Sequence, residues 1–289
     1  MQDSKQNAPK ADRCRSSWVR EHPEYFSEIR GRRRLAQTQL CTTNPDVREI
    51  ACSNLFAAIR KEPDADVWAI GQNDYDFHCE CAKCAAIDAR EESSCGAVLE
   101  FVNFLADRVD REFPGKLIKF SAYQFTRKAP KTVRPRHNVV VRLCDIECAF
   151  NRPLADSTYE RNRTFLADIQ AWSKVAAGNL YIWDYQANFT SYMMPHPNLQ
   201  VFSDNLRLFR DAGAVGVFEQ GDAMCVGGDF AALKCYVTAH LMWDPTKDWR
   251  ALTDEFLRGY YGTAAAPHLK SALEIASASA CVADELVEL

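Results

Sequence analysis

The sequence lacks the features that would mark several common classes of protein. It has 35 Lys and Arg residues against 39 Asp and Glu residues, a formal net charge of -4. No excess of positive charge is therefore available to hold a polyanion. No apolar run approaches the roughly 20 residues of a membrane-spanning helix, and residues 1–20 contain no signal-peptide core. We expect neither a nucleic-acid partner nor a membrane partner.

Familiar catalytic and cofactor-binding signatures are also missing. The chain contains no Gly-x-Ser-x-Gly elbow, no phosphate-binding loop and no Gly-rich dinucleotide fingerprint. Their absence disfavours serine hydrolases of the elbow type, kinases and NAD-dependent enzymes. We expect a function that requires no cofactor.

The chain is long enough, and apolar enough, to bury a substantial core. It has 289 residues, of which 47% are hydrophobic. Residues 1–17 are polar and predict a disordered lead-in. We expect one folded α/β domain over residues 18–289, ending in helices.

Helical and strand-like patterns alternate along this domain. Asn44, Pro45 and Asp46 provide a cap, a first-position proline and a first-turn acid, which predicts a helix over residues 45–61. Further helical patterns lie at about 96–109, 158–175 and 200–212. Short β-rich runs predict strands at 67–70, 117–125, 139–144, 180–185 and 215–219, with a weak candidate at 37–41.

Strands that are apolar at nearly every residue belong in a parallel sheet covered on both faces. Alternating β and α units form either an open sheet or a closed barrel. Acidic residues follow several strands, and barrel strands converge on one mouth at their carboxyl ends. We therefore predict an α/β fold of the (β/α)8 TIM-barrel type. Five or six strands are too few for closure, so the barrel is expected to be incomplete at the N-terminus.

Seven short motifs lie at residues 22–26, 39–45, 71–74, 79–84, 143–148, 181–185 and 241–245. In order and spacing they resemble the domain-of-unknown-function family 4838. The resemblance covers roughly residues 18 to 275. It implies a barrel of the glycoside hydrolase type, distantly similar to α-glucuronidases and encoded in polysaccharide-degrading bacteria. Relatives are expected to be secreted or periplasmic, and to carry the first barrel strands before residue 22.

Four acids near strand ends are the candidate catalytic residues: Asp74, Glu147, Asp184 and Glu219. Two carboxyl groups flanking a glycosidic bond provide the acid and the base or nucleophile of its hydrolysis. For Asp74 the alternative is a loop cap, and for Glu147 it is an ion pair with Arg142. The family resemblance implies that some relatives lack the acid at the positions of Asp184 and Glu219.

The candidate substrate-binding residues surround these acids. Aromatic and polar side chains beside a carboxylate are typical of a sugar subsite. The residues concerned are Arg142, Asp145, Trp183, Tyr185, Asn188 and His196. A lone loop histidine such as His196 is more often structural.

Cys79, Cys81 and Cys84 bring three thiols within six residues. His78 or Cys95 would complete four ligands for a structural zinc ion, since a closed tetrahedral site needs four. A disulfide and free buried thiols are the alternatives. A clip at this loop would stabilise the chain next to Asp74.

The leading hypothesis is a glycosidase that acts on a plant or microbial polysaccharide or oligosaccharide through paired carboxylates. The alternative is a carbohydrate-binding protein without catalysis, with a degenerate barrel. Both hypotheses give the chain a carbohydrate partner.

Overall fold

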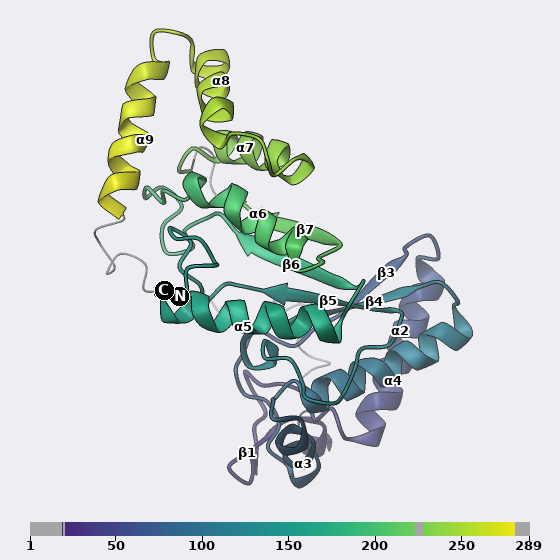
Figure 1. Ribbon diagram of the computed structural model, residues 1–289. Coiled ribbons are helices and arrows are strands. Elements are labelled where there is room, and N and C mark those ends of the chain that lie inside the picture. Colours follow the sequence, from purple (N-terminus) through teal and green to yellow (C-terminus); the bar gives the residue numbers. More distant parts are fainter. Residues whose placement is uncertain (1–18, 20, 223–227, 281–289) are drawn as a thin grey trace, which may run out of the picture. The chain divides into compact units, whose positions relative to one another are not determined.

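The computed structural model describes residues 19, 21–222 and 228–280 (Figure 1). The lead-in predicted at residues 1–17 lies outside them. The chain divides into two compact units, residues 1–141 and 142–289. No helix in the described part of the chain is both long and apolar enough to cross a membrane.

The first unit combines a short hairpin, three helices and two parallel strands. Its elements are η1 (Pro23–Tyr25), β1 (Glu28–Ile29), β2 (Arg32–Arg33), α2 (Pro45–Lys61), β3 (Val67–Ile70), α3 (Ala82–Glu91), α4 (Gly96–Glu112), β4 (Leu117–Ala122) and η2 (Gln124–Thr126). Helix α4 packs against α2, α3 and β4. Its fully buried residues Leu99, Leu105 and Val109 form the centre of this unit's core.

The second unit follows strand β5 (Val139–Cys144), which crosses the division between the units. Its elements are α5 (Glu160–Val175), β6 (Leu180–Tyr185), η3 (Leu199–Val201), α6 (Phe202–Asp211), β7 (Gly216–Gln220), α7 (Ala231–Trp243), α8 (Trp249–Tyr261) and α9 (Ala266–Ala280). Strands β6 and β7 are parallel, α6 contacts α7, and α7, α8 and α9 follow one another in contact.

Helix α2 forms where its local signals predict it. Asn44 Oδ1 accepts hydrogen bonds from the backbone N–H groups of Asp46 (2.9 Å) and Val47 (3.2 Å). These bonds satisfy two of the amides that a helix start leaves without partners. Val47, Cys52, Leu55 and Ile59 form the buried stripe of the helix. The prediction over residues 45–61 is confirmed.

Most other predicted elements are also confirmed, but α3 is missing from the sequence-based prediction. Its N-cap residue is Cys81, whose side chain makes no capping hydrogen bond, and it ends with Glu92 in a left-handed conformation (φ 52°). Neither position carries the Ser, Asp or Gly that usually marks a helix end. Cys84 therefore lies in the first turn of a helix, and not in a loop.

The prediction of a (β/α)8 barrel is wrong. In the described residues the parallel sheet has five strands, in the order β3-β4-β5-β6-β7. The weak strand candidate at residues 37–41 contributes only an isolated bridge between Phe26 and Leu40. Alternating β and α units are common to open sheets and barrels, and acids also gather at the carboxyl ends of strands in open sheets. Neither observation could decide closure.

Candidate active site and cysteine cluster

Three acids form a row across the carboxyl ends of β5, β6 and β7. Asp184 lies opposite Glu219 in the parallel register of β6 and β7. The backbone N–H of Asp145 donates to Trp183 O (3.4 Å), which sets Asp145 beside Asp184. Side chains opposite one another on neighbouring strands share one face of a sheet. The row brings together two predicted catalytic residues and one predicted binding residue.

Asp145 and Asp184 are both buried. Asp184 Oδ1 accepts from the backbone N–H of Tyr185 (2.7 Å), whereas neither Asp145 carboxyl oxygen has a hydrogen-bond partner among the described residues. Burial raises the pKa of Asp184 to about 6. Burial and the neighbouring Asp184 charge raise the pKa of Asp145 well above its usual range. A buried carboxyl beside a second carboxylate is stable when it keeps its proton, and Asp145 is that group.

Glu219 is the member of the row that reaches a cavity. Its side chain is half-buried, and it lines a cavity of about 400 Å³ together with Asn188, Tyr192, Asp222 and Thr238. Burial, and then the Asp184 charge, raise the pKa of Glu219 well above its usual range. Glu219 Oε2 accepts from Gln186 Nε2 (3.1 Å), which holds the carboxyl group in place.

The same cavity has a buried ion pair in its wall. Lys234 Nζ on α7 donates to Asp229 Oδ2 (2.7 Å) and to the carbonyl oxygen of His196 (2.8 Å). Burial lowers the pKa of Lys234, while Asp229 favours its charged form. The backbone N–H of His196 also donates to Asp229 Oδ2 (2.8 Å). These bonds fasten the loop before α6 to the start of α7.

His196, which was predicted to bind substrate, contacts this ion pair through its backbone. Its ring is buried, and its Nε2 has no hydrogen-bond partner among the described residues. Burial, and then the Lys234 charge, lower the pKa of His196 to about 4. The imidazole is therefore neutral at physiological pH, and its backbone atoms make the contacts to Asp229 and Lys234.

The predicted aromatic subsite lies on the other face of the strands. Trp183 stacks on Tyr185 (ring centroids 5.8 Å apart) and meets Phe218 edge-on (5.2 Å). The Arg142 guanidinium lies 3.9 Å from the Trp183 ring centroid. Because successive side chains of a strand point to opposite faces, Trp183 cannot share a face with Asp184. The strand pattern thus separates Arg142 and Trp183 from the carboxyl row.

The two remaining predicted acids, Asp74 and Glu147, are not members of this row. Asp74 is exposed in the first unit, and its Oδ1 accepts from the Tyr123 hydroxyl (2.7 Å). Glu147 is half-buried in the segment after β5. Asn188 Oδ1 accepts from the backbone N–H of Thr190 (3.0 Å), so its oxygen shapes the loop while the residue lines the cavity.

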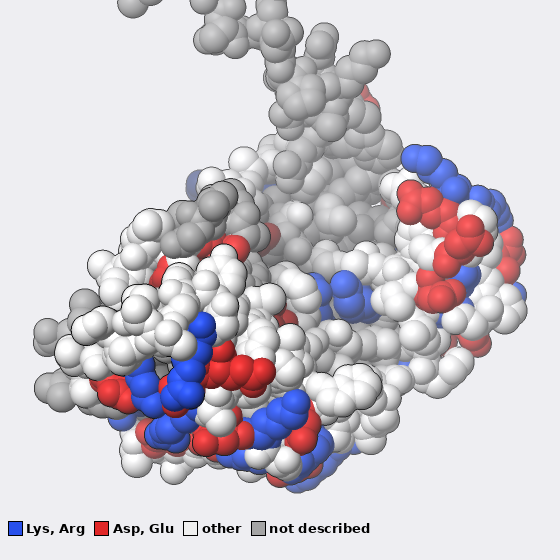
Figure 2. Space-filling model, turned by 90° about the horizontal axis from the view of Figure 1, so that it is seen from above, with Lys and Arg blue, Asp and Glu red and all other residues white. Residues whose placement is uncertain are grey.

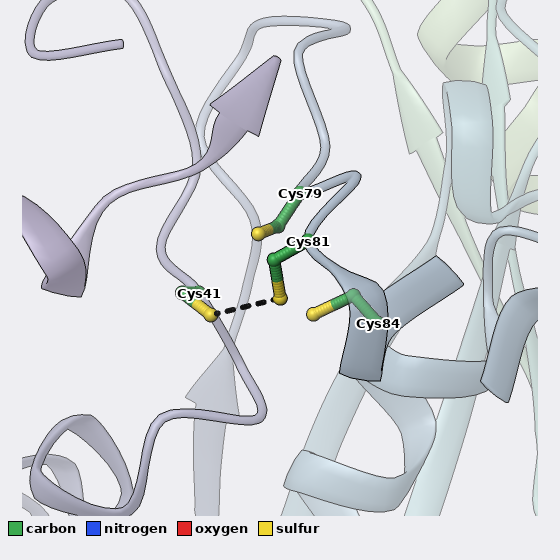
Figure 3. Close-up of side chains that lie close together, drawn as sticks. All are labelled: Cys41, Cys79, Cys81 and Cys84. Atoms are coloured by element: carbon green, nitrogen blue, oxygen red, sulfur yellow. Dashed lines mark hydrogen bonds between the residues drawn. The ribbon is translucent and has the colours of Figure 1, made fainter. Parts of the chain in front are cut away.

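The predicted cysteine cluster contains a fourth thiol. The sulfur atoms of Cys41, Cys79, Cys81 and Cys84 all lie within 4.8 Å of one another (Figure 3). The fourth candidate ligand is Cys41, and not the predicted His78 or Cys95. Three of these cysteines are buried, Cys81 is half-buried, and all four are free thiols. The four side chains could hold a metal ion.

On the face viewed in Figure 2, Lys and Arg side chains are interspersed with Asp and Glu side chains. Mixed charge of this kind is typical of a solvated surface.

The family assignment rests on a match over nearly the whole chain. Residues 14–274 match the model of a family described as Domain of unknown function (DUF4838). The chain belongs to this family. No curated protein matches the chain. Membership in DUF4838 agrees with the seven motifs, and it assigns no reaction.

Sequence reasoning missed several residues of both sites. Asp222, Asp229 and Lys234 reach the cavity from the segment after β7 and from α7. Only the position of Asp222 after a strand end hinted at a site. Cys41 is 38 residues before Cys79 in the sequence, so spacing alone could not join it to the cluster.

Proposed function

We propose that this chain is a glycoside hydrolase that acts on a plant or microbial glycan, with Glu219 as the proton donor. The observation that carries the proposal is the setting of Glu219. Its pKa is raised well above the usual range, and its side chain lines a cavity of about 400 Å³. A general acid must be protonated at working pH and must reach the substrate.

The second carboxyl group of the proposed pair is Asp222, which lines the same cavity. Protonated Glu219 transfers its proton to the glycosidic oxygen as the bond to the anomeric carbon breaks. Asp222 activates the water, or attacks the anomeric carbon itself, which are the two known routes. Asp184 does not reach the cavity in this scheme. Its charge keeps the proton on Glu219.

The aromatic and uncharged polar groups in the cavity wall support a sugar ligand. Tyr192 offers an aromatic ring, and Asn188, Gln186 and Thr238 offer amide and hydroxyl groups. A few polar groups around an otherwise apolar wall are typical of small-ligand sites. Lys234 adds a buried positive charge to the wall. Uronic-acid sugars carry a carboxylate that could pair with this charge, so they are a suitable class of test substrates.

The test compares substrates that differ in their need for an acid. A panel of aryl glycosides and uronic-acid oligosaccharides identifies a substrate, and its derivatives with poor and good leaving groups are then assayed. Glu219→Gln should lose turnover of the poor leaving group by at least about 100-fold, the lower range for general acid catalysis. It should retain most turnover of the activated derivative. Asp222→Asn should lose both.

Matched variants make the result decisive. Glu274→Gln changes an exposed acid on α9 and should leave turnover unchanged. Glu147→Gln and Asp74→Asn test the acids that the sequence favoured. Equal loss with both leaving groups in Glu219→Gln, or full activity, would contradict the role of Glu219. If Glu147→Gln loses turnover and Glu219→Gln does not, the general acid is Glu147.

The alternative is a carbohydrate-binding protein without catalysis. It is favoured by the aromatic groups beside β6, where Trp183, Tyr185 and Phe189 follow one another in ring contact. Stacked aromatic rings bind the apolar faces of sugars. Calorimetry separates the two functions: a glycan that binds without product formation, and whose binding is lost in Trp183→Ala but kept in Glu219→Gln, supports this alternative.

A further inference from the structure

The four sulfurs of the cysteine cluster have the spacing of a tetrahedral metal site. Sulfurs about 2.3 Å from a tetrahedral ion lie about 3.8 Å from one another. Cys41 Sγ and Cys81 Sγ are 3.7 Å apart, and all four sulfurs lie within 4.8 Å. A disulfide would need about 2.05 Å. The arrangement therefore fits four ligands around a common centre better than any bonded pair.

The surroundings of the sulfurs are those of thiolate ligands. The backbone N–H of Glu28 donates to Cys79 Sγ (3.3 Å), and Arg33 Nη1 lies 3.8 Å from the same sulfur. Thr43 Oγ1 lies 3.2 Å from Cys84 Sγ and 3.6 Å from Cys41 Sγ. Donors that approach ligand atoms from outside orient metal ligands and tune the site.

The position of Cys84 adds a second electrostatic factor. Cys81 is the N-cap of α3, and Cys84 lies in the first turn of the same helix. The N-terminus of a helix carries a partial positive charge, which favours a thiolate. The Thr43 hydroxyl, the Glu28 amide and the Arg33 guanidinium likewise favour negative sulfurs at this place.

We infer that Cys41, Cys79, Cys81 and Cys84 bind one structural zinc ion. Four sulfur ligands close a tetrahedral shell and leave no position for a reacting water molecule, so the ion stabilises the fold. Cys41 reaches the ion from the segment before α2, whereas the other three ligands lie 38 to 43 residues later. The ion joins these two segments. The inference is independent of the proposed glycosidase activity.

The joined segments carry a set of hydrogen bonds that lead to Asp74. Gln39 Nε2 donates to the carbonyl oxygens of Asn73 (2.7 Å) and Tyr75, and Gln39 Oε1 accepts from the Asn73 backbone N–H (2.8 Å). Glu80 N donates to Glu28 O (2.7 Å). Zinc at Cys41 and Cys79 thus holds both ends of the turn that contains Asp74.

The experiment measures metal content and ligand geometry in the full chain. The protein is purified without added metal or chelator, and zinc and iron are measured by mass spectrometry. One zinc per chain is expected. Replacement with Co²⁺ should give the intense visible bands of a tetrahedral thiolate site. Stoichiometric iron, a disulfide mass in the unreduced chain, or four free thiols with no metal would each overturn the inference.

A pair of variants tests Cys41, the ligand that only the structure identifies. Cys41→Ser should weaken zinc binding by more than about 100-fold, beyond the effect of losing an outer contact. Cys52→Ser changes another buried free cysteine, on α2 and outside the cluster, and should keep one zinc per chain. Full zinc content in Cys41→Ser would overturn the four-cysteine site. If Cys41→Ser does not fold, the Co²⁺ spectrum of the unmodified chain decides the number of thiolate ligands.

Discussion

Asp184 on β6 lies directly opposite Glu219 on β7, so two carboxyl groups share one face at the ends of neighbouring strands. Adjacent strands are about 4.8 Å apart, and the acids are therefore close enough to affect each other's protonation. Burial raises the pKa of both groups, and the Asp184 charge raises the pKa of Glu219 further. The relationship leads to a test that does not depend on any substrate.

The unmodified chain should lose stability as pH rises because Asp184 ionises, and Asp184→Asn should not show this loss. The folded-state pKa of Asp184 is raised from 3.8 to about 6. A raised pKa favours folding below the unfolded value of about 4, and this contribution is lost as pH rises through 6. The loss is on the order of 3 kcal/mol, at about 1.4 kcal/mol for each pKa unit. Asn keeps the oxygen that accepts from Tyr185, and it does not ionise.

The measurement is the free energy of urea unfolding between pH 4 and pH 7. As pH rises, Asp184→Asn should become more stable than the unmodified chain, because the Asn side chain does not ionise. Removing the Asp184 charge also lowers the pKa of Asp145 and Glu219. Asp211→Asn, at an exposed acid at the end of α6, should follow the unmodified chain. If the free energies of unfolding of Asp184→Asn and of the unmodified chain change with pH in parallel, burial does not raise the pKa of Asp184.

Lys234→Met should destabilise the second unit strongly, because it leaves Asp229 without its partner. The two groups are 2.7 Å apart, and their side chains are 9% and 16% exposed. Breaking a buried ion pair from one side costs about 3 to 5 kcal/mol. Adding Asp229→Asn should restore much of the loss, since the uncompensated charge disappears. Additive effects of the two changes, measured by chemical denaturation, would show that the pair does not interact.

Chelation should lower the melting temperature of the chain, and a mild reductant alone should not. The physical reason is that zinc binding contributes to folding, whereas no disulfide is present among the described cysteines. Calorimetry with a chelator, a reductant and neither reagent distinguishes these cases. If the reductant lowers the melting temperature and the chelator does not, the cysteines form a disulfide and do not bind zinc.

Thr43→Val should weaken zinc binding by about 10 to 100-fold, the range for outer-shell groups. Thr43 Oγ1 approaches the sulfurs of Cys41, Cys81 and Cys84 at 3.2 to 3.8 Å. Thr42→Val is the control, because the Thr42 hydroxyl makes no sulfur contact in the described part of the chain. Competition with a colorimetric chelator measures both variants, and equal affinities would remove Thr43 from the site.

Asn44→Ala should cost about 1 kcal/mol of stability, the usual value of an N-cap. Asn44 Oδ1 satisfies two backbone amides at the start of α2. Asn44→Asp keeps an acceptor oxygen at this position and should be nearly neutral. Thermal unfolding of both variants checks the prediction, and equal destabilisation by Ala and Asp would show that the cap bond is not the cause.

The sequence by itself determined the local elements of this protein. Asn44, Pro45 and Asp46 start α2 because capping depends on residues within one helical turn. The runs at 67–70, 139–144 and 180–185 are the strands β3, β5 and β6, because strand patterns are also local. The order of seven motifs was enough to indicate the family, which the match over residues 14–274 confirms.

Only the tertiary structure decided how these elements combine. Sheet closure depends on which distant strands pair, and the alternation of strands and helices is the same in open sheets and in barrels. The register of β6 against β7 placed Asp184 beside Glu219, and strand alternation placed Trp183 on the other face. Cys41 joined Cys79, Cys81 and Cys84 because folding brought together segments that sequence spacing keeps apart. Such long-range contacts leave no periodic pattern in the chain, and a single sequence could not reveal them.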